Sequence, residues 1–210
     1  DQPRSRGLGD VYKRQCPVLK DFWSKQHPRR GSTNDRERHR SQDKRISVTM
    51  YQVKICGVRE LPSAIAATTG GANFLGFNFV PNSRRLVSAE AVRLMIEQLS
   101  QKGEDDLPQM VGVFANQPTL YINAVAEFCN LDLIQLSGEE PMAIGASMIK
   151  PVIKAIKVNP NVSDHEEFRR VEQLMVVAEK KGILPLLDRY DATAYGGTGK
   201  SVNWNFARKV

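Results

Sequence analysis

Two side chains in this sequence have the chemistry of acid–base catalysis and stand in similar places. Cys56 closes the stretch 51–57, in which alternating apolar and polar residues followed by glycine predict a strand that delivers its last residue to a loop. Asp188 closes a later apolar stretch, 183–188. Strand alternation turns Lys54 to the side of Cys56, where its charge favours the thiolate, and a partly desolvated aspartate is a suitable proton donor. We therefore expect Cys56 and Asp188 to face one another across a single site.

Each of these side chains also has a structural alternative. A free cysteine is among the most buried residue types, and an aspartate that ends a strand often only caps the next loop. Cys129 falls in a predicted helix, where we expect it to belong to the core. The turn at 81–85 is either solvated or presents Arg85 at the rim of the site, where a guanidinium holds a carboxylate through two parallel hydrogen bonds.

Residues 194–201 read Ala-Tyr-Gly-Gly-Thr-Gly-Lys-Ser, which is close to a phosphate-binding P-loop with alanine at the first glycine position. A P-loop leaves its strand directly and opens a helix, whereas Ala194 follows Asp188 by six positions. We favour a mobile lid over the substrate and keep nucleotide binding as the alternative. His165 lies in the first turn of a predicted surface helix, so we expect it to be solvated.

Hydrophobic periodicity alternates between that of strands and that of helices along the body of the chain. The predicted strands cover 51–57, 73–80, 109–115, 131–136, 151–158 and 183–188. Predicted helices begin at 61, 88, 118, 139 and 163, and the chain ends in the start of another. Ser88 and Ser163 are the predicted helix caps. Consecutive strand–helix units imply parallel strands, either in a doubly wound open sheet or in a (β/α) barrel.

Polar residues gather at the carboxyl ends of these strands, which is the edge where both folds bind ligands. They come from almost every unit: Cys56, Arg85, Asn116, Gln135 and Asp188. A doubly wound sheet binds at one switch point, so this spread favours the barrel. The predicted fold class is α/β, of the TIM (β/α)8 barrel family, with about six of the eight units in this sequence. We expect the seventh and eighth units, which commonly build the phosphate site, to lie beyond residue 210.

The net charge of +7 belongs to the first part of the chain. Residues 1–49 hold 13 basic and 6 acidic side chains, whereas residues 50–210 hold 17 of each. Few aliphatic residues occur in 1–49, so we expect a disordered basic leader and a catalytic domain at 50–210. A leader that binds RNA is the alternative. The segment 6–15 resembles a string found at the ends of translated environmental reads, so we expect the leader to be non-native. Three widely spaced cysteines predict neither a disulfide framework nor a metal site, and they indicate a reducing, cytoplasmic setting.

The motifs taken together closely resemble the phosphoribosylanthranilate isomerase family, in order from about Met50 to the last residue. They are 54–57, 71–77, 83–85, 111–114, 134–139, 153–156, 187–188 and 195–200. The resemblance implies a (β/α)8 barrel and the third step of tryptophan biosynthesis, an Amadori rearrangement without a cofactor. A P-loop nucleotide binder, or another phosphosugar isomerase or synthase built on a barrel, is the alternative function.

The resemblance also implies roles for individual residues. Asp188 is expected to be the general acid that opens the ribose ring, Cys56 the general base at C2, and Arg85 the ligand of the anthranilate carboxylate. Four further residues are expected to contact the substrate: Lys54, Gln135, Gly197 and Gly199. We expect a phosphorylated small-molecule substrate, no nucleic-acid or membrane partner, and a monomer or homodimer.

Two residues depart from the family's pattern. Ser137 stands where a histidine is usual, which we expect to weaken polar packing around the substrate. Arg189 stands where a threonine is common, which we expect to place a positive charge beside the general acid and favour its ionised form. Because we expect two barrel units beyond residue 210, we also expect residues 1–210 alone to be inactive and their first and sixth strands to be unpaired edges.

Overall fold

The computed structural model describes residues 52–101, 107–161, 163–190 and 202–210. Its contacts divide the chain into Asp1–Val53 and Lys54–Val210, and only the second unit is treated below. The leader predicted for residues 1–49 lies outside the described residues.

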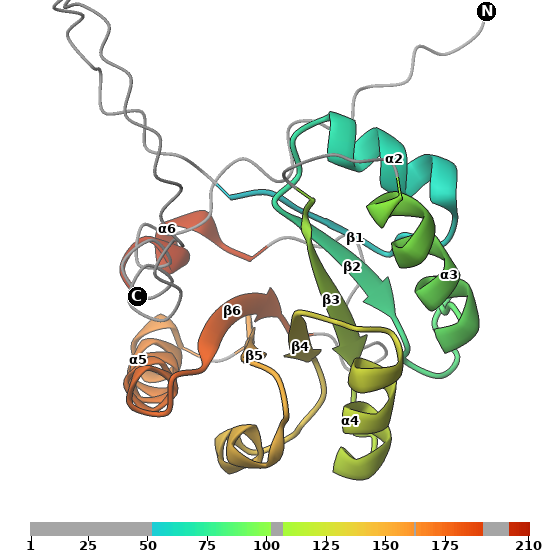
Figure 1. The fold of residues 1–210 in the computed structure, drawn as a ribbon. Helices are drawn as coiled ribbons and strands as arrows, with labels where there is room; N and C mark the ends of the chain where they lie inside the picture. The colour runs from blue at the N-terminus through green and yellow to red at the C-terminus, as the bar shows by residue number, and fades with distance from the viewer. Residues whose placement is uncertain (1–51, 102–106, 162, 191–201) are drawn as a thin grey trace, which may run out of the picture. The chain divides into compact units, whose positions relative to one another are not determined.

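Six parallel strands form one sheet in the order β1-β2-β3-β4-β5-β6, so each strand pairs with the next along the chain (Figure 1). The strands are β1 Lys54–Cys56, β2 Phe74–Asn78, β3 Gln109–Phe114, β4 Leu133–Leu136, β5 Val152–Val158 and β6 Leu184–Arg189. Sequential order favours the barrel of the two predicted architectures, because a doubly wound sheet reverses its strand order at the switch point. Strands β1 and β6 form the two edges of the described sheet.

Helices follow the strands as the sequence predicts. They are α2 Leu61–Thr69, α3 Ala89–Ser100, α4 Thr119–Phe128, α5 Asp164–Lys180 and α6 Trp204–Ala207. The predicted caps are confirmed: the Ser88 side chain accepts a hydrogen bond from the Ala91 amide, and that of Ser163 accepts one from Glu166. The two caps lie directly before α3 and α5, where the apolar periodicity begins. They therefore set where each loop ends and its helix starts.

The helix predicted to begin at residue 139 is wrong. A 3-10 helix, Met142–Ser147, follows β4 instead. Pro141 has an extended backbone (ψ 151°). Glu140, which precedes this proline, is biased away from helical geometry. The Glu140 side chain is also buried in a network described below, so this segment serves the loop after β4.

The alternating pattern of 51–57 also predicts a buried first strand, and the structure corrects this. Ile55 in β1 is 38% exposed, and β1 is an edge of the described sheet.

One face of the sheet packs against helices and carries the main core. Its largest buried side chains include Leu75, Phe77, Phe114, Ile134 and Leu136. Cys129 is 1% exposed within this core, which confirms the prediction made for it. A second cluster lies where β5 meets α5 and α6: Ile156, Val158, Val171 and Phe206. Burial of these apolar side chains is the main stabilising term in the fold. We call this helix-covered side of the sheet the outer face and the opposite side the inner face.

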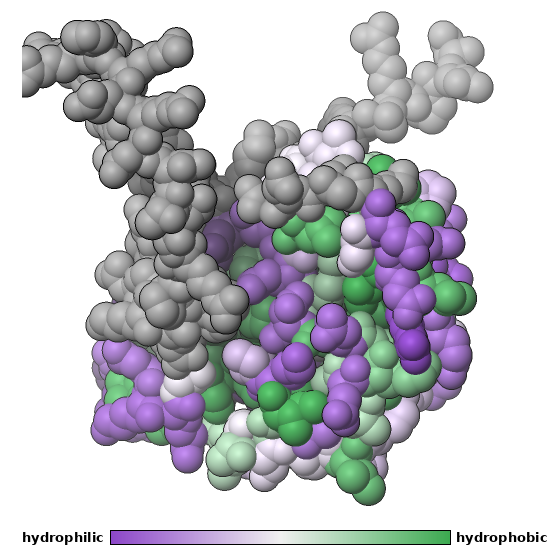
Figure 2. All heavy atoms as spheres, in the orientation of Figure 1, coloured by the Kyte–Doolittle hydropathy of each residue, from purple (hydrophilic) through white to green (hydrophobic). Residues whose placement is uncertain are grey.

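The helices present polar residues outward. On the face shown in Figure 2, hydrophobic side chains stand in separate groups among hydrophilic ones, as is normal for a protein surface. Within the described part of the chain, no helix is both long and apolar enough to cross a bilayer.

An ion pair ties α5 to the end of β5. The Glu167 carboxylate is 3% exposed, pairs with Arg170 at 2.6 Å, and accepts the Asn159 amide at 2.7 Å. Arg170 in turn donates to the carbonyl oxygen of Lys157. The Arg170 hydrogen bond is the main reason that the pKa of Glu167 lies below its usual value, and the Asn159 amide adds to it, while burial acts in the opposite direction.

This carboxylate should make the stability of the protein pH-dependent. A group whose pKa is lower in the folded state contributes stability above its unfolded pKa of about 4.3, and the contribution is lost as the pH falls through the folded value. Glu167→Gln should lower the free energy of unfolding by about 1.5–3 kcal/mol at pH 7 and by much less at pH 3. Urea unfolding at the two pH values measures this difference. Glu172→Gln, on an exposed position of α5, is the matched control, and an equal loss at both pH values would contradict the assignment.

Candidate active site

The strand register places Cys56 and Asp188 on the inner face. Residues paired in a parallel sheet point to the same side, and so do residues two or four apart in one strand. Only such steps separate the two residues. Cys56 pairs with Gly76, and Asn78, two residues further along β2, pairs with Val113. Val113 pairs with Gln135 and Gln135 with Ile153, and Lys157, four residues further along β5, pairs with Asp188. Cys56 ends β1, and Asp188 is the next-to-last residue of β6. Both therefore lie at the carboxyl edge of the sheet, on the strands that form its two sides.

Cys56 sits in a cluster of polar side chains that link β1 to β4. The Lys54 ammonium lies 3.4 Å from the Cys56 sulfur and donates to Gln135 Oε1 at 2.6 Å. Gln135 Nε2 donates to the Ser137 hydroxyl at 2.9 Å. Because an ammonium only donates, it must face the amide oxygen, and the amide nitrogen must then find an acceptor. Buried Ser137 supplies that acceptor, and the weaker polar packing expected around the substrate stays a prediction.

Two glycines make room for this cluster. A Cβ added to Gly76 would lie 2.9 Å from the Cys56 sulfur, closer than real Cβ atoms come, and 3.1 Å from Lys54 Nζ, which is a tight contact. Gly57 has φ +83°, and a Cβ there would lie 2.4 Å from Cδ of Arg85. The close approach at Gly57 therefore brings the stem of Arg85 over the backbone beside Cys56.

Arg85 lies at the rim, as the sequence predicts. Its amide donates to the Ser83 hydroxyl at 3.2 Å, and Ser83 also accepts a hydrogen bond from Asn78 at the end of β2. Arg85 is exposed, so the loop is anchored while the side chain reaches toward solvent next to Cys56. The structure thus brings together Lys54, Cys56 and Gln135, with the stem of Arg85 beside Gly57.

Asp188 has a partner that the sequence prediction missed. The Lys157 ammonium lies 2.5 Å from Asp188 Oδ2, and the two side chains are 11% and 32% exposed. Lys157 is the register partner of Asp188 on β5. Lys157 could have been identified from the sequence by alternation along β5, starting from the residue that pairs with Gln135. That step needs the register between β4 and β5, which depends on contacts between distant segments.

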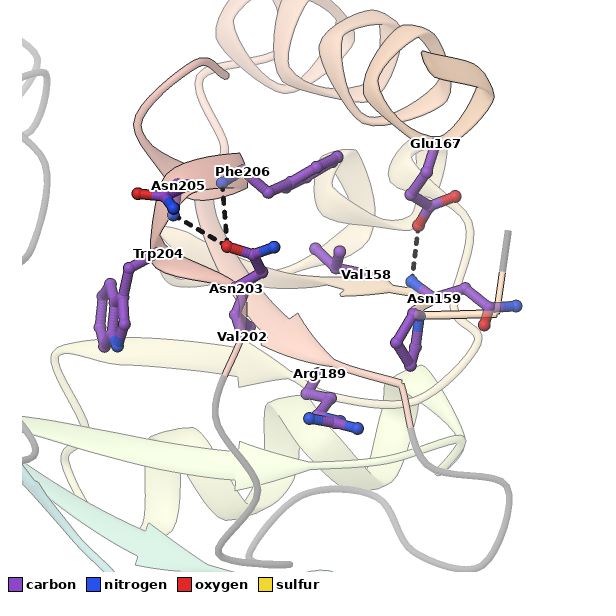
Figure 3. A pocket seen from close by; sticks show the side chains of 10 residues that line it. Val158, Asn159, Glu167, Arg189, Val202, Asn203, Trp204, Asn205 and Phe206 are labelled. Atoms are coloured by element: carbon purple, nitrogen blue, oxygen red, sulfur yellow. Dashed lines mark hydrogen bonds between the residues drawn. The ribbon is translucent and has the colours of Figure 1, made fainter. Parts of the chain in front are cut away.

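The strand register does not support the expected position of Arg189 beside the Asp188 carboxyl. Arg189 is paired in register with Val158, so it points to the outer face while Asp188 points to the inner one. Arg189 lines a cavity of about 480 Å³ together with Glu167 and Phe206, and Figure 3 shows these side chains. Adjacent residues of a strand point to opposite sides, and Lys157 is the cation that faces the carboxylate.

A buried network holds the loops behind the site. Lys154 pairs with Glu140 at 2.9 Å and donates to the Gly138 carbonyl at 2.6 Å, and both charged residues are buried. The second Glu140 oxygen accepts the Asn116 amide at 2.6 Å. Asn116, which the sequence places at the rim, therefore belongs to a tie between the loops after β3 and β4.

The remaining predicted residues are placed as follows. Gly197, Gly199 and the P-loop-like segment 194–201 lie outside the described residues. His165 is exposed, as predicted, and its Nδ1 lies 3.1 Å from Arg169 Nη2. Among the described residues, no group of three or more His, Cys, Asp or Glu side chains could hold a metal ion.

A parallel α/β sheet with acid–base side chains at its carboxyl edge defines an enzyme of the (β/α) barrel class. Comparison with known proteins identifies the family. The family model of N-(5'-phosphoribosyl)anthranilate (PRA) isomerase matches residues 53–210. A curated relative, the N-(5'-phosphoribosyl)anthranilate isomerase of Geobacter metallireducens, is 38% identical over 158 residues, which are 75% of this chain and 71% of the relative.

Solved structures agree. Phosphoribosyl anthranilate isomerase from Thermus thermophilus is 29% identical with a TM-score of 0.60, and the match covers 75% of this chain and 70% of that one. Another phosphoribosyl anthranilate isomerase, 32% identical with a TM-score of 0.54 and matched over 68% of this chain and 66% of its own, was solved with reduced 1-(o-carboxyphenylamino)-1-deoxyribulose 5-phosphate.

The chain belongs to the N-(5'-phosphoribosyl)anthranilate isomerase family. It is an isomerase of tryptophan biosynthesis with the fold of the TIM-barrel family, and its substrate is a phosphorylated small molecule. This resolves the functional alternatives in favour of the isomerase over the nucleotide binder and the other phosphosugar enzymes.

The Lys54 contact should make Cys56 the more reactive of the two described thiols. Burial raises the pKa of Cys129 to about 11, with the Glu90 charge adding to it, so Cys129 is almost fully protonated at pH 8. In a Cys16→Ser background, iodoacetamide should therefore modify Cys56 first, and Lys54→Met should slow that step roughly three- to tenfold. Mass spectrometry of the labelled peptides measures the rates.

Lys180→Met, which removes an exposed charge at the end of α5, is the control for the change in net charge. Equal labelling rates in Lys54→Met and in the unaltered protein would show that Lys54 does not activate the thiol.

Proposed function

We propose that this chain rearranges N-(5'-phosphoribosyl)anthranilate by acid–base catalysis, with Asp188 as the general acid and Cys56 as the general base. The observation that supports the proposal is the inner-face register, because it puts a thiol and a carboxyl at one edge of the sheet, on its two outermost described strands. A sugar between β1 and β6 would have a proton donor on one side and a base on the other.

The proposed reaction begins with ring opening. Asp188 gives a proton to the ribose ring oxygen as the bond from that oxygen to C1 breaks, and the lone pair of the anthranilate nitrogen forms the C1=N bond of a Schiff base. The ring oxygen leaves as a hydroxyl group on C4. Protonation of the leaving oxygen avoids an alkoxide, which is the contribution of a general acid.

Enolisation follows at C2. The Cys56 thiolate takes the C2 proton, and the electron pair of that C–H bond forms C1=C2 and neutralises the nitrogen. Transfer of a proton to C1 and loss of the proton on the C2 hydroxyl give the ketose, 1-(2-carboxyphenylamino)-1-deoxyribulose 5-phosphate. Both the acid and the base are protein side chains, so no cofactor takes part in these steps.

Lys54 and Gln135 support the base in this proposal. The ammonium lies 3.4 Å from the sulfur, and the bond from Lys54 to buried Gln135 holds that ammonium in place. The sulfur and the amide oxygen thus both contact the same charge. Both side chains also face the space that the sugar would occupy, which agrees with their expected contacts to the substrate.

Arg85 is proposed to bind the anthranilate carboxylate. It is exposed at the rim, its stem crosses Gly57, and its guanidinium can form two parallel hydrogen bonds to a carboxylate. This placement sets the aromatic ring of the substrate near β1 and β2 and the sugar further across the sheet.

The wider setting of the enzyme is also a proposal. We assign catalysis to a domain at 50–210, since the family match begins at residue 53, and we retain Gly197 and Gly199 as substrate contacts on the basis of the resemblance. We propose a cytoplasmic monomer or homodimer. In support of the dimer, a solved relative from Thermotoga maritima is described as dimeric.

Removal of either catalytic group should affect kcat. In the complete gene product that contains this chain, Cys56→Ala and Asp188→Asn should each lower kcat by about 10²–10⁴ with little change in KM, the range for loss of a general acid or base. Steady-state formation of the ketose measures both constants. Either variant retaining more than a tenth of the original kcat would remove that residue from its proposed role.

Loss of the rim arginine should instead affect binding. Arg85→Met should raise KM about 10- to 100-fold, which corresponds to a charge-assisted hydrogen bond of about 1.5–3 kcal/mol, and should lower kcat much less. Arg84→Met, which leaves the Arg84 carbonyl that accepts from Arg59 unchanged, is the neighbouring control. A KM for Arg85→Met equal to that of this control would contradict carboxylate binding by Arg85.

A further inference from the structure

The partner of Asp188 raises a chemical question about the proposed general acid. A general acid must direct its proton at the leaving oxygen, whereas one oxygen of the Asp188 carboxyl lies 2.5 Å from the Lys157 ammonium. Lys157 is therefore part of the acid's machinery or an obstacle to it.

Lys157 is fixed both at its backbone and at its side chain. Its carbonyl oxygen accepts a hydrogen bond from Arg170 on α5, and its side chain, 11% exposed, meets Asp188 from the neighbouring strand. A lysine that only solubilised the rim would keep its ammonium in water. This one directs its charge onto the single described carboxylate of the inner face.

Few other charges on the described strands can act on Asp188. By register, the titratable residues of the inner face are Lys54, Cys56, Lys157 and Asp188. Lys54 is engaged with Cys56 and Gln135 on the far side of the sheet. Arg189 points to the outer face, and Arg85 stands at the rim beside Gly57. Lys157 is the charged group in direct contact with the carboxylate.

We infer that Lys157 is a positioning residue for the isomerisation: it holds Oδ2 of Asp188 and leaves Oδ1 for the sugar. This inference rests on the role proposed above for Asp188. Anchoring one carboxyl oxygen restricts the side chain to one orientation, which favours a productive geometry for proton transfer.

The test is the steady-state kinetics of Lys157→Met in the complete gene product. Loss of the anchor should lower kcat about tenfold, with KM changed less than threefold. Lys157→Arg keeps a cationic hydrogen-bond donor at the same place and should restore most of kcat. Lys181→Met, an exposed charge removal at the end of α5, should leave kcat and KM unchanged.

The outcomes separate this inference from the proposed function. If Asp188→Asn keeps full activity, the acid role itself fails. If Asp188→Asn is inactive while Lys157→Met keeps the original kcat, the Lys157 inference alone is overturned. If Lys157→Met unfolds at the assay temperature, the test uses Lys157→Gln, which also lacks the charge. A folded Lys157→Arg protein that fails to restore kcat would likewise overturn the inference.

Discussion

The site depends on the register of a parallel sheet. Side chains alternate between the two faces of each strand, so a shift of one residue in any pairing between β1 and β6 would move either Cys56 or Asp188 to the helix-covered side. The outer face holds the large apolar core and thereby fixes the register. Packing on one side of the sheet thus determines which polar residues meet on the other.

Two lysine contacts follow from that register. The Lys54 ammonium lies beside the Cys56 thiol, and the Lys157 ammonium lies beside the Asp188 carboxyl. Each of the two proposed catalytic groups therefore contacts a cation from its own or the neighbouring strand. In this proposal both groups are held in place before the substrate binds.

Local patterns predicted most of the architecture, because strands, helix caps and glycine stops depend on residues that lie close together in the chain. They placed Cys56, Gln135 and Asp188 at strand ends because those ends are marked by adjacent turns. They failed where the outcome depends on partners distant in the chain. The charge next to Asp188 in sequence belongs to Arg189 and points away, whereas the charge next to it in space belongs to Lys157, 31 residues earlier. The lost helix after β4 has the same origin, because Glu140 is drawn into a buried pair with Lys154.

The central claim is that Cys56 and Asp188 act on one sugar from the two sides of the inner face. The most direct measurement is a crystal structure of the complete gene product with reduced 1-(o-carboxyphenylamino)-1-deoxyribulose 5-phosphate, the compound bound in a solved relative. The account predicts the Cys56 sulfur within about 4 Å of C2 and an Asp188 oxygen within about 3 Å of the C4 hydroxyl. A sugar bound away from the inner face, or in contact with only one of these side chains, would contradict it.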